Sequence, residues 1–326
     1  MKTEKNIGLA ILFVITFQVF TVGLIEAKEE EYPEKPIQFL VGYAPGSLSD
    51  LAARAISRIA PKYLGKPTVI VNMPGASSTV ALNELAKSAP DGHTIATMTH
   101  SYKALTVHQQ KIPFDPKILK PVLGFAEYRM VLFVRGDSPF AKLEDFVAYG
   151  QKNREAITYG HAGRGVTTHL AGELFFRSAN IKATDVPYKG ATWQGVAGGH
   201  ILAAVTDTYG LKQHVSAGTL RILVSFVDQR LKEFPDVPTS QEKGYADVSS
   251  LNSLLCVAVH RDTPIDRAKK LHEALKKVVE DPEFVKIMGD IGLKCGYIPP
   301  ETLEETISKT EKLGFPLLKE LKLFIQ

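Results

Sequence analysis

The chain has 326 residues, of which 44% are hydrophobic and 23% are charged, a balance typical of a globular protein with a sizeable core. Its formal charge of +4 arises from 39 Lys and Arg against 35 Asp and Glu. This excess is small and spread along the chain, whereas a nucleic-acid binder concentrates Lys and Arg in one stripe or helix. We therefore expect no nucleic-acid partner.

The N-terminal segment has the pattern of a secretory signal peptide. Lys2 and Lys5 precede an uncharged apolar run over residues 7–25, and the small residue Ala27 precedes a charged stretch. We predict a signal peptide over residues 1–27 with cleavage after Ala27, and Gly23 as the second choice. A retained membrane anchor is the alternative, because the run approaches the ~20 residues that span a bilayer. With the signal peptide removed, the mature chain is expected to be secreted.

The next hundred residues alternate short apolar strands with helical patterns. Strands are predicted at residues 37–41, 68–71 and 94–98, and helices at residues 51–64 and 79–89. Strands that alternate with helices indicate βαβ units with a largely parallel sheet and helices on both faces.

The alternation starts again near residue 130. Strands are predicted at 130–134, 157–159, 185–188, 201–206, 221–226 and 254–259, and helices at 143–152, 168–178, 265–280 and 282–291. A last helical region covers residues 300–324, with an interruption expected at Gly314 and Pro316.

These elements predict an α/β protein of two lobes, each a mostly parallel sheet flanked by helices. Residues 28–128 form the first part of lobe 1, residues 129–253 form lobe 2, and residues 254–326 return to lobe 1 with the C-terminal helices. Ligands of such sheets bind beyond the carboxyl ends of the strands, so function is expected in the loops from strand to helix.

Two such loops have the same physical character. Residues 43–50 (YAPGSLSD) and residues 160–168 (GHAGRGVTT) each combine glycines with hydroxyl residues at the start of a helix. A helix N-terminus has unsatisfied N–H groups and a partial positive charge, which favours an anion. Each loop could equally be a tight turn with a Ser or Thr cap. Two of them in one two-lobed chain favour a carboxylate clamp.

The mature chain resembles the receptors of tripartite tricarboxylate transporters, also called Bug-type solute receptors. The resemblance covers nearly all of it, through YPEKPIQFLVGYAPGSLSDLAARAI, VNMPGASSTVALNELAKSAPDGHTIATM, IPFDP, TYGHAGRGVTTHLAGELF, VPYKGATWQGVAGGHILAAVTD and FPDVPTSQEKGY. It implies a periplasmic-binding-protein fold that closes around a small di-, tri- or aromatic carboxylate. The partners it implies are one large and one small integral membrane subunit, and we expect the receptor itself to be a monomer.

The resemblance also assigns ligand-binding positions. Tyr43 is expected to line the cleft, the backbone of residues 46–48 and the Ser49 hydroxyl to contact a carboxylate, and Asp207 to hold an amine or a water. Asp50 matches an acidic position that caps the helix. The full predicted set is Tyr43, Gly46, Ser47, Leu48, Ser49, His161, Ala162, Gly163, Arg164, Gly165, Val166, Thr167, Thr168 and Asp207.

Three residues depart from the usual family pattern. Ser47 stands where the family commonly has a second glycine, and His161 and Arg164 stand where it has small or neutral residues. Arg164 is either a bidentate partner for a second carboxylate of the ligand or a solvated loop arginine. If it clamps a second carboxylate, Arg164→Ala should weaken diacids far more than monoacids.

Enzymatic alternatives lack their motifs. There is no GxSxG nucleophile elbow, and Val166 replaces the essential lysine of a Walker-type phosphate loop at Gly160–Gly165. The histidines have no metal-binding spacing, so neither a metal nor an organic cofactor is expected. Cys256 and Cys295 could form a disulfide or remain thiols. A receptor that feeds a signalling protein rather than a transporter is an alternative that these motifs do not separate.

Overall fold

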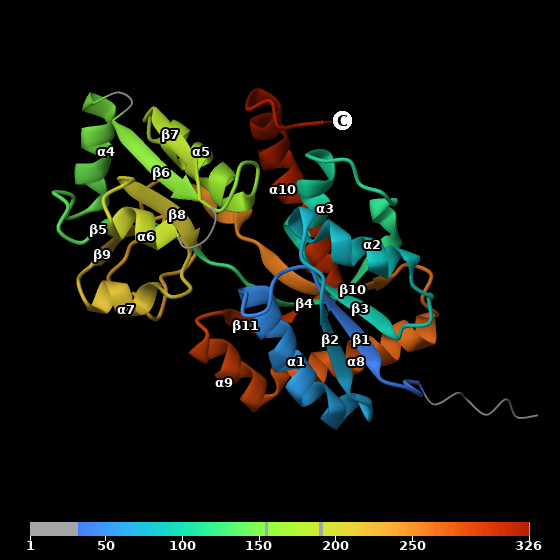
Figure 1. Ribbon diagram of the computed structural model, residues 1–326. Helices are drawn as coiled ribbons and strands as arrows, with labels where there is room; N and C mark the ends of the chain where they lie inside the picture. Colours follow the sequence, from blue (N-terminus) through green and yellow to red (C-terminus); the bar gives the residue numbers. More distant parts are fainter. Residues whose placement is uncertain (1–31, 154–155, 189–191, 326) are drawn as a thin grey trace, which may run out of the picture. The chain divides into compact units, whose positions relative to one another are not determined.

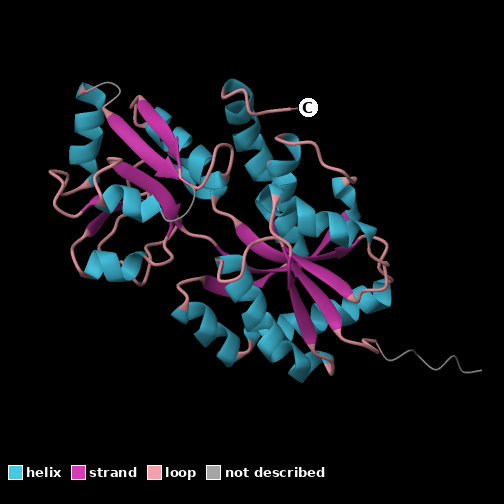
Figure 2. Ribbon diagram, in the orientation of Figure 1, coloured by secondary structure: helices cyan, strands magenta, loops and turns pink. Residues whose placement is uncertain are grey.

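The computed structural model describes residues 32–153, 156–188 and 192–325. The predicted signal peptide and its cleavage site therefore lie outside the described residues. Residues 32–326 form one compact unit that contains two sheets, each with its own helices (Figures 1 and 2).

The sheet of lobe 1 has six strands in the order β11-β4-β10-β3-β1-β2. The strands are β1 (Ile37–Val41), β2 (Thr68–Asn72), β3 (Thr94–Thr99), β4 (Leu119–Glu127), β10 (Leu254–His260) and β11 (Lys294–Ile298). One face packs on α1 (Leu48–Leu64), α8 (Ile265–Glu280) and α9 (Pro282–Asp290). The other face packs on α2 (Thr79–Lys87) and α3 (His100–Ala104).

The sheet of lobe 2 has five strands in the order β7-β6-β8-β5-β9. These are β5 (Met130–Arg135), β6 (Ile157–His161), β7 (Ala183–Pro187), β8 (Ala203–Asp207) and β9 (Leu220–Ser225). One face packs on α4 (Leu143–Lys152) and α5 (Thr167–Ser178), and the other on α6 (Thr192–Ala197) and α7 (Leu211–Ser216). Both faces of each sheet are thus buried, as the runs of apolar residues in the strands require.

The directions of the strands correct the sequence prediction. The two-lobed α/β fold is as predicted, but the sheets are mixed rather than mostly parallel. In lobe 1, β1 pairs in parallel with β2 and β3, whereas β10 runs antiparallel to both β3 and β4. In lobe 2, β5 runs antiparallel to both of its neighbours. The strands that run opposite to the rest of their sheet are β10 and β11 in lobe 1 and β5 in lobe 2. Hydrophobic patterning does not encode strand direction.

Two strands of lobe 1 were not predicted, and both contain residues that usually interrupt a strand. Pro121 lies within β4, where a register shift beside its partner Ala258 accommodates a residue without an N–H donor. Gly296 lies within β11 at a second register shift, between Cys295 and Ile298. The sheet therefore tolerates these residues at bulges.

The C-terminal helix α10 (Pro300–Glu320) is continuous, so the predicted interruption at Gly314 and Pro316 is wrong. Pro316 cannot donate a backbone hydrogen bond to the helix. The burial of Leu317 and Leu318 in one apolar cluster with Leu170 of α5 offsets this loss and keeps the helix continuous. Gly314 allows the close approach of Leu105, which follows α3, to the helix. The second half of α10 thus packs against elements of both lobes.

Two chain segments pass between the lobes, and one buried side chain joins them. Asn252, just before β10, accepts a hydrogen bond from the Met130 N–H at 3.2 Å and donates one to the Phe226 carbonyl at 2.6 Å. In the described part of the chain, no helix is long and apolar enough to cross a membrane. Cys256 and Cys295 are both free thiols.

Candidate functional site

The pocket between the two sheets has a volume of about 390 Å³ and is lined by both lobes. Its wall consists mainly of hydroxyl-bearing and small apolar side chains. The lining residues are Tyr43, Ser47, Leu48, Ser49, Ser77, Thr99, Ser101, Leu105, Thr106, Tyr128, Met130, Ala162, Gly165, Val166, Thr167, Thr168, Asp207 and Ser253. Among the described residues, no Lys, Arg or His lines it.

The first loop presents the N-terminus of α1 to this pocket. Ser47 is the N-cap, and its Oγ accepts the N–H of Asp50 at 3.3 Å. Gly46 has a φ of 82°, a left-handed conformation that favours glycine, and its N–H donates to the Asp50 carboxylate at 2.8 Å. The N–H groups of Leu48 and Ser49, in the first turn, have no acceptor within the helix and remain for a ligand.

Asp50 itself lies behind the loop and is almost fully buried. Besides Gly46, Arg54 Nε donates to it at 2.9 Å and Asn72 Nδ2 at 2.8 Å. Burial acts to raise the pKa of the Asp50 carboxyl, but these hydrogen bonds outweigh burial and hold the pKa below its usual value. The carboxylate therefore organises the loop, and Asp50 does not line the pocket.

The second loop presents the N-terminus of α5, but most of its glycine N–H groups are already used. The N–H groups of Gly163 and Gly165 lie 3.1 Å from Nδ1 of His161 and of His169, respectively. The Ala162 N–H donates to Thr168 Oγ1 at 3.1 Å. The first-turn N–H groups of Thr167 and Thr168 again have no acceptor within the helix. In both loops, therefore, the helix end is available to a ligand and the glycine-rich turn is not.

Hydroxyl groups join the two lobes across the pocket. Thr167 Oγ1 of lobe 2 lies 3.2 Å from Ser253 Oγ, which lies 3.1 Å from Ser101 Oγ of lobe 1. Near the other loop, Ser49 Oγ lies 3.0 Å from Tyr128 Oη. Hydroxyl groups both donate and accept, so this lining can rearrange around an anion without a formal charge of its own.

Asp207 is the one acidic residue among the described residues that line the pocket. It ends β8, and its carboxylate accepts the Tyr209 N–H at 2.9 Å. Burial raises the pKa of this carboxyl above its usual value, although the backbone hydrogen bonds act in the opposite direction. The neighbouring Tyr128 likewise has a raised pKa because it is buried. This part of the pocket thus favours uncharged groups and hydrogen-bond donors.

The pocket brings together ten of the fourteen predicted ligand-binding residues. Gly46, His161, Gly163 and Arg164 do not line it. Gly46 and Gly163 instead hold the turns, and Arg164 turns to Asp185, with Nε and Nη2 at 2.8 and 2.9 Å from the carboxylate oxygens. The structure thus gives no support to a clamp by Arg164. Ligand contact by the other ten stays a prediction.

Eight lining residues were not predicted from the sequence. Thr99 ends β3, and Ser101 and Thr106 follow it. Tyr128 and Met130 lie where the chain enters lobe 2, and Ser253 lies where it returns. Ser77 and Leu105 complete the set. No local motif identifies the crossing segments, and β4 was not predicted, but the end of the predicted strand β3 was an available signal, since ligands bind beyond strand ends.

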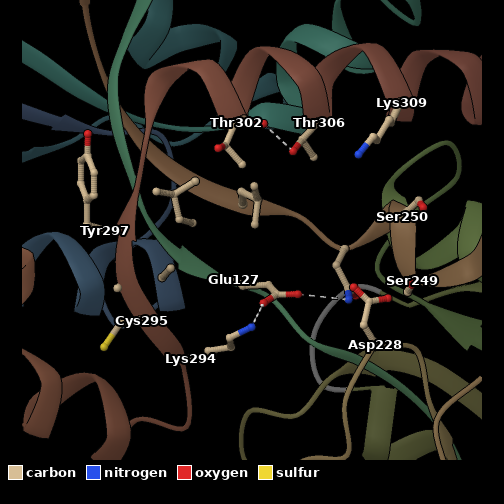
Figure 3. Close-up of a pocket in the computed structure, with 15 residues that line it drawn as sticks. Glu127, Asp228, Ser249, Ser250, Lys294, Cys295, Tyr297, Thr302, Thr306 and Lys309 are labelled. Atoms are coloured by element: carbon tan, nitrogen blue, oxygen red, sulfur yellow. Dashed lines mark hydrogen bonds and ion pairs between the residues drawn. The ribbon is translucent and has the colours of Figure 1, made fainter.

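A second pocket of about 430 Å³ lies against the same crossing segments, between β4, β10, β11 and α10 (Figure 3). Its charged groups are partly paired with one another, with Lys294 Nζ 2.9 Å from the Glu127 carboxylate. Lys309 of α10 points into this space, and Asp228 faces it from the opposite side. None of the residues that line it belongs to the loops at residues 43–50 and 160–168, so we take the pocket between the sheets as the candidate ligand site.

Two lobes around a hydroxyl-lined pocket with two opposed helix N-termini define a solute-binding receptor. Residues 52–323 match the sequence model of the tripartite tricarboxylate transporter family receptors, and the chain belongs to this family. The resemblance noted in the sequence is thereby confirmed.

Relatives and solved structures agree with this assignment. A Cupriavidus necator protein named "UPF0065 protein in gbd 5'region" is 30% identical over 301 residues, which are 91% of each chain. A solved structure of a periplasmic transporter is 27% identical, with a TM-score of 0.77, and covers 90% of this chain and 100% of that chain. MatC of Rhodopseudomonas palustris, solved with bound malate, is 25% identical, with a TM-score of 0.72, and covers 87% of this chain and 100% of its own.

Proposed function

We propose that this protein is a periplasmic receptor that captures a small carboxylate in the pocket between its lobes. It delivers the ligand to a transporter of one large and one small membrane subunit, acts as a monomer, and carries out no chemical step. The N-terminal segment directs secretion. The family supports the transport role, and the malate-bound structure of MatC supports carboxylate chemistry.

The observation that carries the proposal is that the N-termini of α1 and α5 reach the same pocket from different lobes. Hydrogen bonds from N–H groups to an ionised acceptor contribute about 1.5–3 kcal/mol each. Three or four of them, less the cost of ordering the ligand and the lobes, reach micromolar affinity, about −8 kcal/mol. Both sets exist together only when the lobes close, so the ligand stabilises the closed state.

The position of Asp207 narrows the ligand chemistry. Its half-buried carboxyl lines the pocket without a cation beside it among the described residues. A second carboxylate placed there would be repelled, whereas a hydroxyl or ammonium group would donate to it. We therefore infer a carboxylate ligand that carries a hydrogen-bond donor toward Asp207, as the 2-hydroxyl of malate would.

A thermal-shift screen of the purified protein against mono-, di- and tricarboxylates and aromatic acids tests the receptor function. A ligand at about 100 times its Kd adds about 2.7 kcal/mol, or roughly 5–10 °C in Tm for lobes of this size. A shift limited to one class of carboxylate supports the proposal. If no acid shifts the Tm, before or after unfolding and refolding to release a retained ligand, the carboxylate assignment is wrong.

Malate and succinate, which differ by one hydroxyl, test the role of Asp207. We expect the wild type to bind malate more tightly by roughly tenfold, the effect of one hydrogen bond to a charged group. Asp207→Asn should reduce this preference. An equal preference in the wild type and in the variant would remove Asp207 from the ligand contacts.

A further inference from the structure

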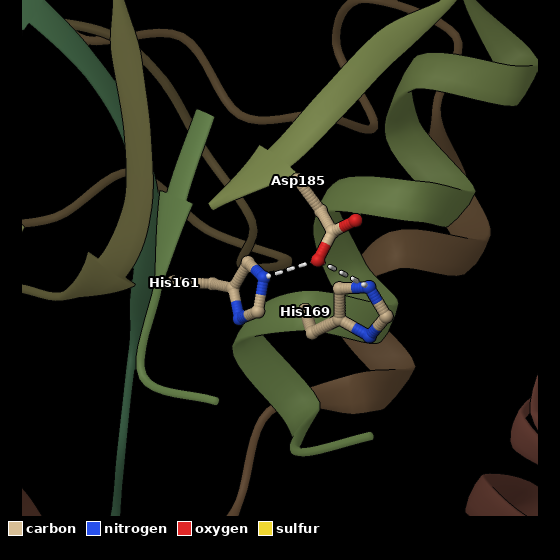
Figure 4. A group of neighbouring side chains, drawn as sticks. All are labelled: His161, His169 and Asp185. Atoms are coloured by element: carbon tan, nitrogen blue, oxygen red, sulfur yellow. Dashed lines mark hydrogen bonds and ion pairs between the residues drawn. The ribbon is translucent and has the colours of Figure 1, made fainter. Parts of the chain in front are cut away.

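Asp185 of β7 does not line the pocket, and its carboxylate faces His161 at the end of β6 and His169 in the first turn of α5 (Figure 4). Arg164 forms a bidentate pair with its carboxylate, at 2.8 and 2.9 Å. His161 Nε2 lies 3.2 Å from the same carboxylate, and His169 Nε2 lies 3.8 Å from it. One carboxylate therefore faces three cationic or hydrogen-bonding side chains.

The two imidazoles connect the Asp185 carboxylate to the backbone of the loop. Each turns Nε2 toward Asp185, and each has Nδ1 3.1 Å from a loop N–H, that of Gly163 for His161 and that of Gly165 for His169. Because His169 Nδ1 accepts from Gly165, the neutral His169 ring carries its proton on Nε2, which faces the carboxylate. His161 Nδ1 also lies 2.9 Å from the Gly163 carbonyl, so this ring contacts both backbone groups of Gly163. Three consecutive residues, 163 to 165, are thus tied to Asp185 directly or through a histidine.

These contacts matter for the pocket because the same loop lines it. Ala162, Gly165 and Val166 are lining residues, and α5 begins immediately after them at Thr167. Gly163 and Gly165 have φ values of 152° and 81°, which glycine adopts readily. Glycine adopts many other conformations as well, so it does not by itself fix the shape of this turn. The contacts with Asp185 supply that selection.

A metal ion is the competing interpretation, because one ligand atom from each of His161, His169 and Asp185 lies within 4.8 Å of the others. Two features oppose it. Both carboxylate oxygens already accept from Arg164. A metal on Nε2 of His169 would also move the proton to Nδ1, which would remove the hydrogen bond from Gly165. The geometry is that of a hydrogen-bonded network.

The charges around the network are consistent with neutral histidines. Burial lowers the pKa of His161, and burial together with the adjacent His161 lowers the pKa of His169 to about 4. Burial acts to raise the pKa of the Asp185 carboxyl, but the hydrogen bonds from Arg164 and His161 hold it below its usual value.

Among the described residues near the network, Tyr159, Glu173 and Arg177 interact with one another. Tyr159 of β6 donates to Glu173 of α5 at 2.9 Å, and Arg177 lies 3.3 Å from the same Glu173 carboxylate.

We propose that Asp185 is a positioning residue for the ligand site: through Arg164, His161 and His169 it holds the second loop in its binding conformation without touching the ligand. In the same arrangement, Arg164 serves Asp185 and not the ligand. This inference rests on the proposed carboxylate-receptor function.

The test compares Asp185→Asn, Arg164→Ala and the double variant in calorimetric titrations with malate, adipate and benzoate. Asp185→Asn should raise the Kd of whichever acids the wild type binds by about tenfold, and Arg164→Ala by about threefold, equally for mono- and diacids. The double variant should be no weaker than Asp185→Asn, because both substitutions break one network. Asp137→Asn is the matched control, since Asp137 forms an exposed pair with Arg135 in the same lobe.

The outcomes separate this inference from the function on which it rests. If the wild type binds none of these acids and no acid in the thermal-shift screen, the proposed function fails. If the wild type binds and Asp185→Asn binds equally well, the positioning role fails. A loss limited to diacids in Arg164→Ala would instead show a direct clamp. Should Asp185→Asn fold poorly, Arg164→Ala still tests the network, because the Arg164 side chain is 59% exposed.

Histidine titration by NMR provides a readout that does not depend on a ligand or on stability. Removing the guanidinium leaves the Asp185 charge unbalanced beside His161, so Arg164→Ala should raise the pKa of His161. An unchanged pKa would overturn the coupling. Binding of Zn²⁺ by the wild type, measured in the same samples, would overturn the hydrogen-bonded arrangement in favour of a metal site.

Discussion

The two loops at the pocket have the same arrangement but build it from different residues. Each places a helix N-terminus toward the pocket and a carboxylate on the far side of the turn, where an arginine pairs with it. In the first loop, Asp50 and Arg54 belong to α1 itself and lie one turn apart. In the second, Asp185 comes from β7 and Arg164 from the loop.

This difference determines how strongly each loop is fixed. Asp50 is 1% exposed and accepts directly from the N–H of Gly46, so it belongs to the turn. The Asp185 side chain is 19% exposed and reaches the N–H groups of Gly163 and Gly165 only through imidazoles. The first loop is therefore held by one buried carboxylate, and the second by a relay that contains ionisable groups.

The largest effect is expected from Asp50→Asn. The substitution weakens the hydrogen bonds from Gly46, Arg54 and Asn72 together, so the free energy of unfolding should fall by about 2 kcal/mol. The Kd for the ligand should rise by more than in Asp185→Asn, and urea denaturation and calorimetry would measure both. Glu283→Gln is the control, because Glu283 pairs with Arg58 of the same helix on the surface, where such pairs contribute little. An effect of Asp50→Asn no larger than that of the control would show that the first loop holds its shape without its carboxylate.

The same contrast explains what could be predicted from the sequence. The pattern at residues 43–54 contains a glycine, a Ser cap and an Asp four residues before an Arg, all within reach of local rules. Nothing local connects Arg164 with Asp185, which are 21 residues apart in the sequence and meet only because β6 pairs with β7. For that reason Arg164 could be read either as a ligand clamp or as a solvated side chain.

The fold shows a similar division. Strands without turn-forming residues, such as β1 and β5, were predicted within a residue or so of their bounds. In contrast, β4 contains Pro121 and Gly124, and its strand character depends on pairing with β10 at bulges. The pocket residues Ser101 and Ser253 are 152 residues apart, and their contact follows from the return of β10 to the first sheet. Local patterns thus identify elements and caps, whereas pairing across the sheet decides the rest.

Acid should weaken the second loop before the first. The pKa of His169 is lowered from its ordinary 6.5 to about 4, so the unfolded chain binds a proton between these values that the folded chain does not. The free energy of unfolding should therefore fall as the pH decreases from about 6.5 to about 4. In His169→Gln this fall should be smaller by about 2 kcal/mol. Denaturation at pH 7 and pH 4.5 would measure it, with the exposed His200→Gln as control. Equal falls in both variants would show that His169 does not titrate in this range.

Matched hydroxyl deletions compare the two helix ends directly. Ser49→Ala in the first loop and Thr167→Val in the second each remove one lining hydroxyl. Each should raise the Kd roughly three- to tenfold, the effect of one hydrogen bond. Ser57→Ala, which removes a hydroxyl of α1 that bonds Thr68 and does not line the pocket, is the control. A loss in only one of the two variants would mean that the ligand uses one helix end, and the clamp would be reduced to a single loop.

The smallest effect concerns the contact between the lobes. Gln109 of lobe 1 donates to the Gly165 carbonyl of the second loop at 2.9 Å, and a side chain at Gly165 would collide with it. The adjacent Gln110 bonds Ala76 and Thr79 within lobe 1. Because the Gln109 contact requires the lobes to be close, Gln109→Ala should favour the open state and raise the Kd about two- to threefold, with Gln110→Ala unchanged. Calorimetry on Gln109→Ala and Gln110→Ala separates the loss of a contact between the lobes from the loss of contacts within lobe 1. Equal Kd values for the two variants would mean that the Gln109 contact does not contribute to closure. The affinity of lobe 2 for the ligand would then depend on the conformation of the second loop, which Asp185 sets.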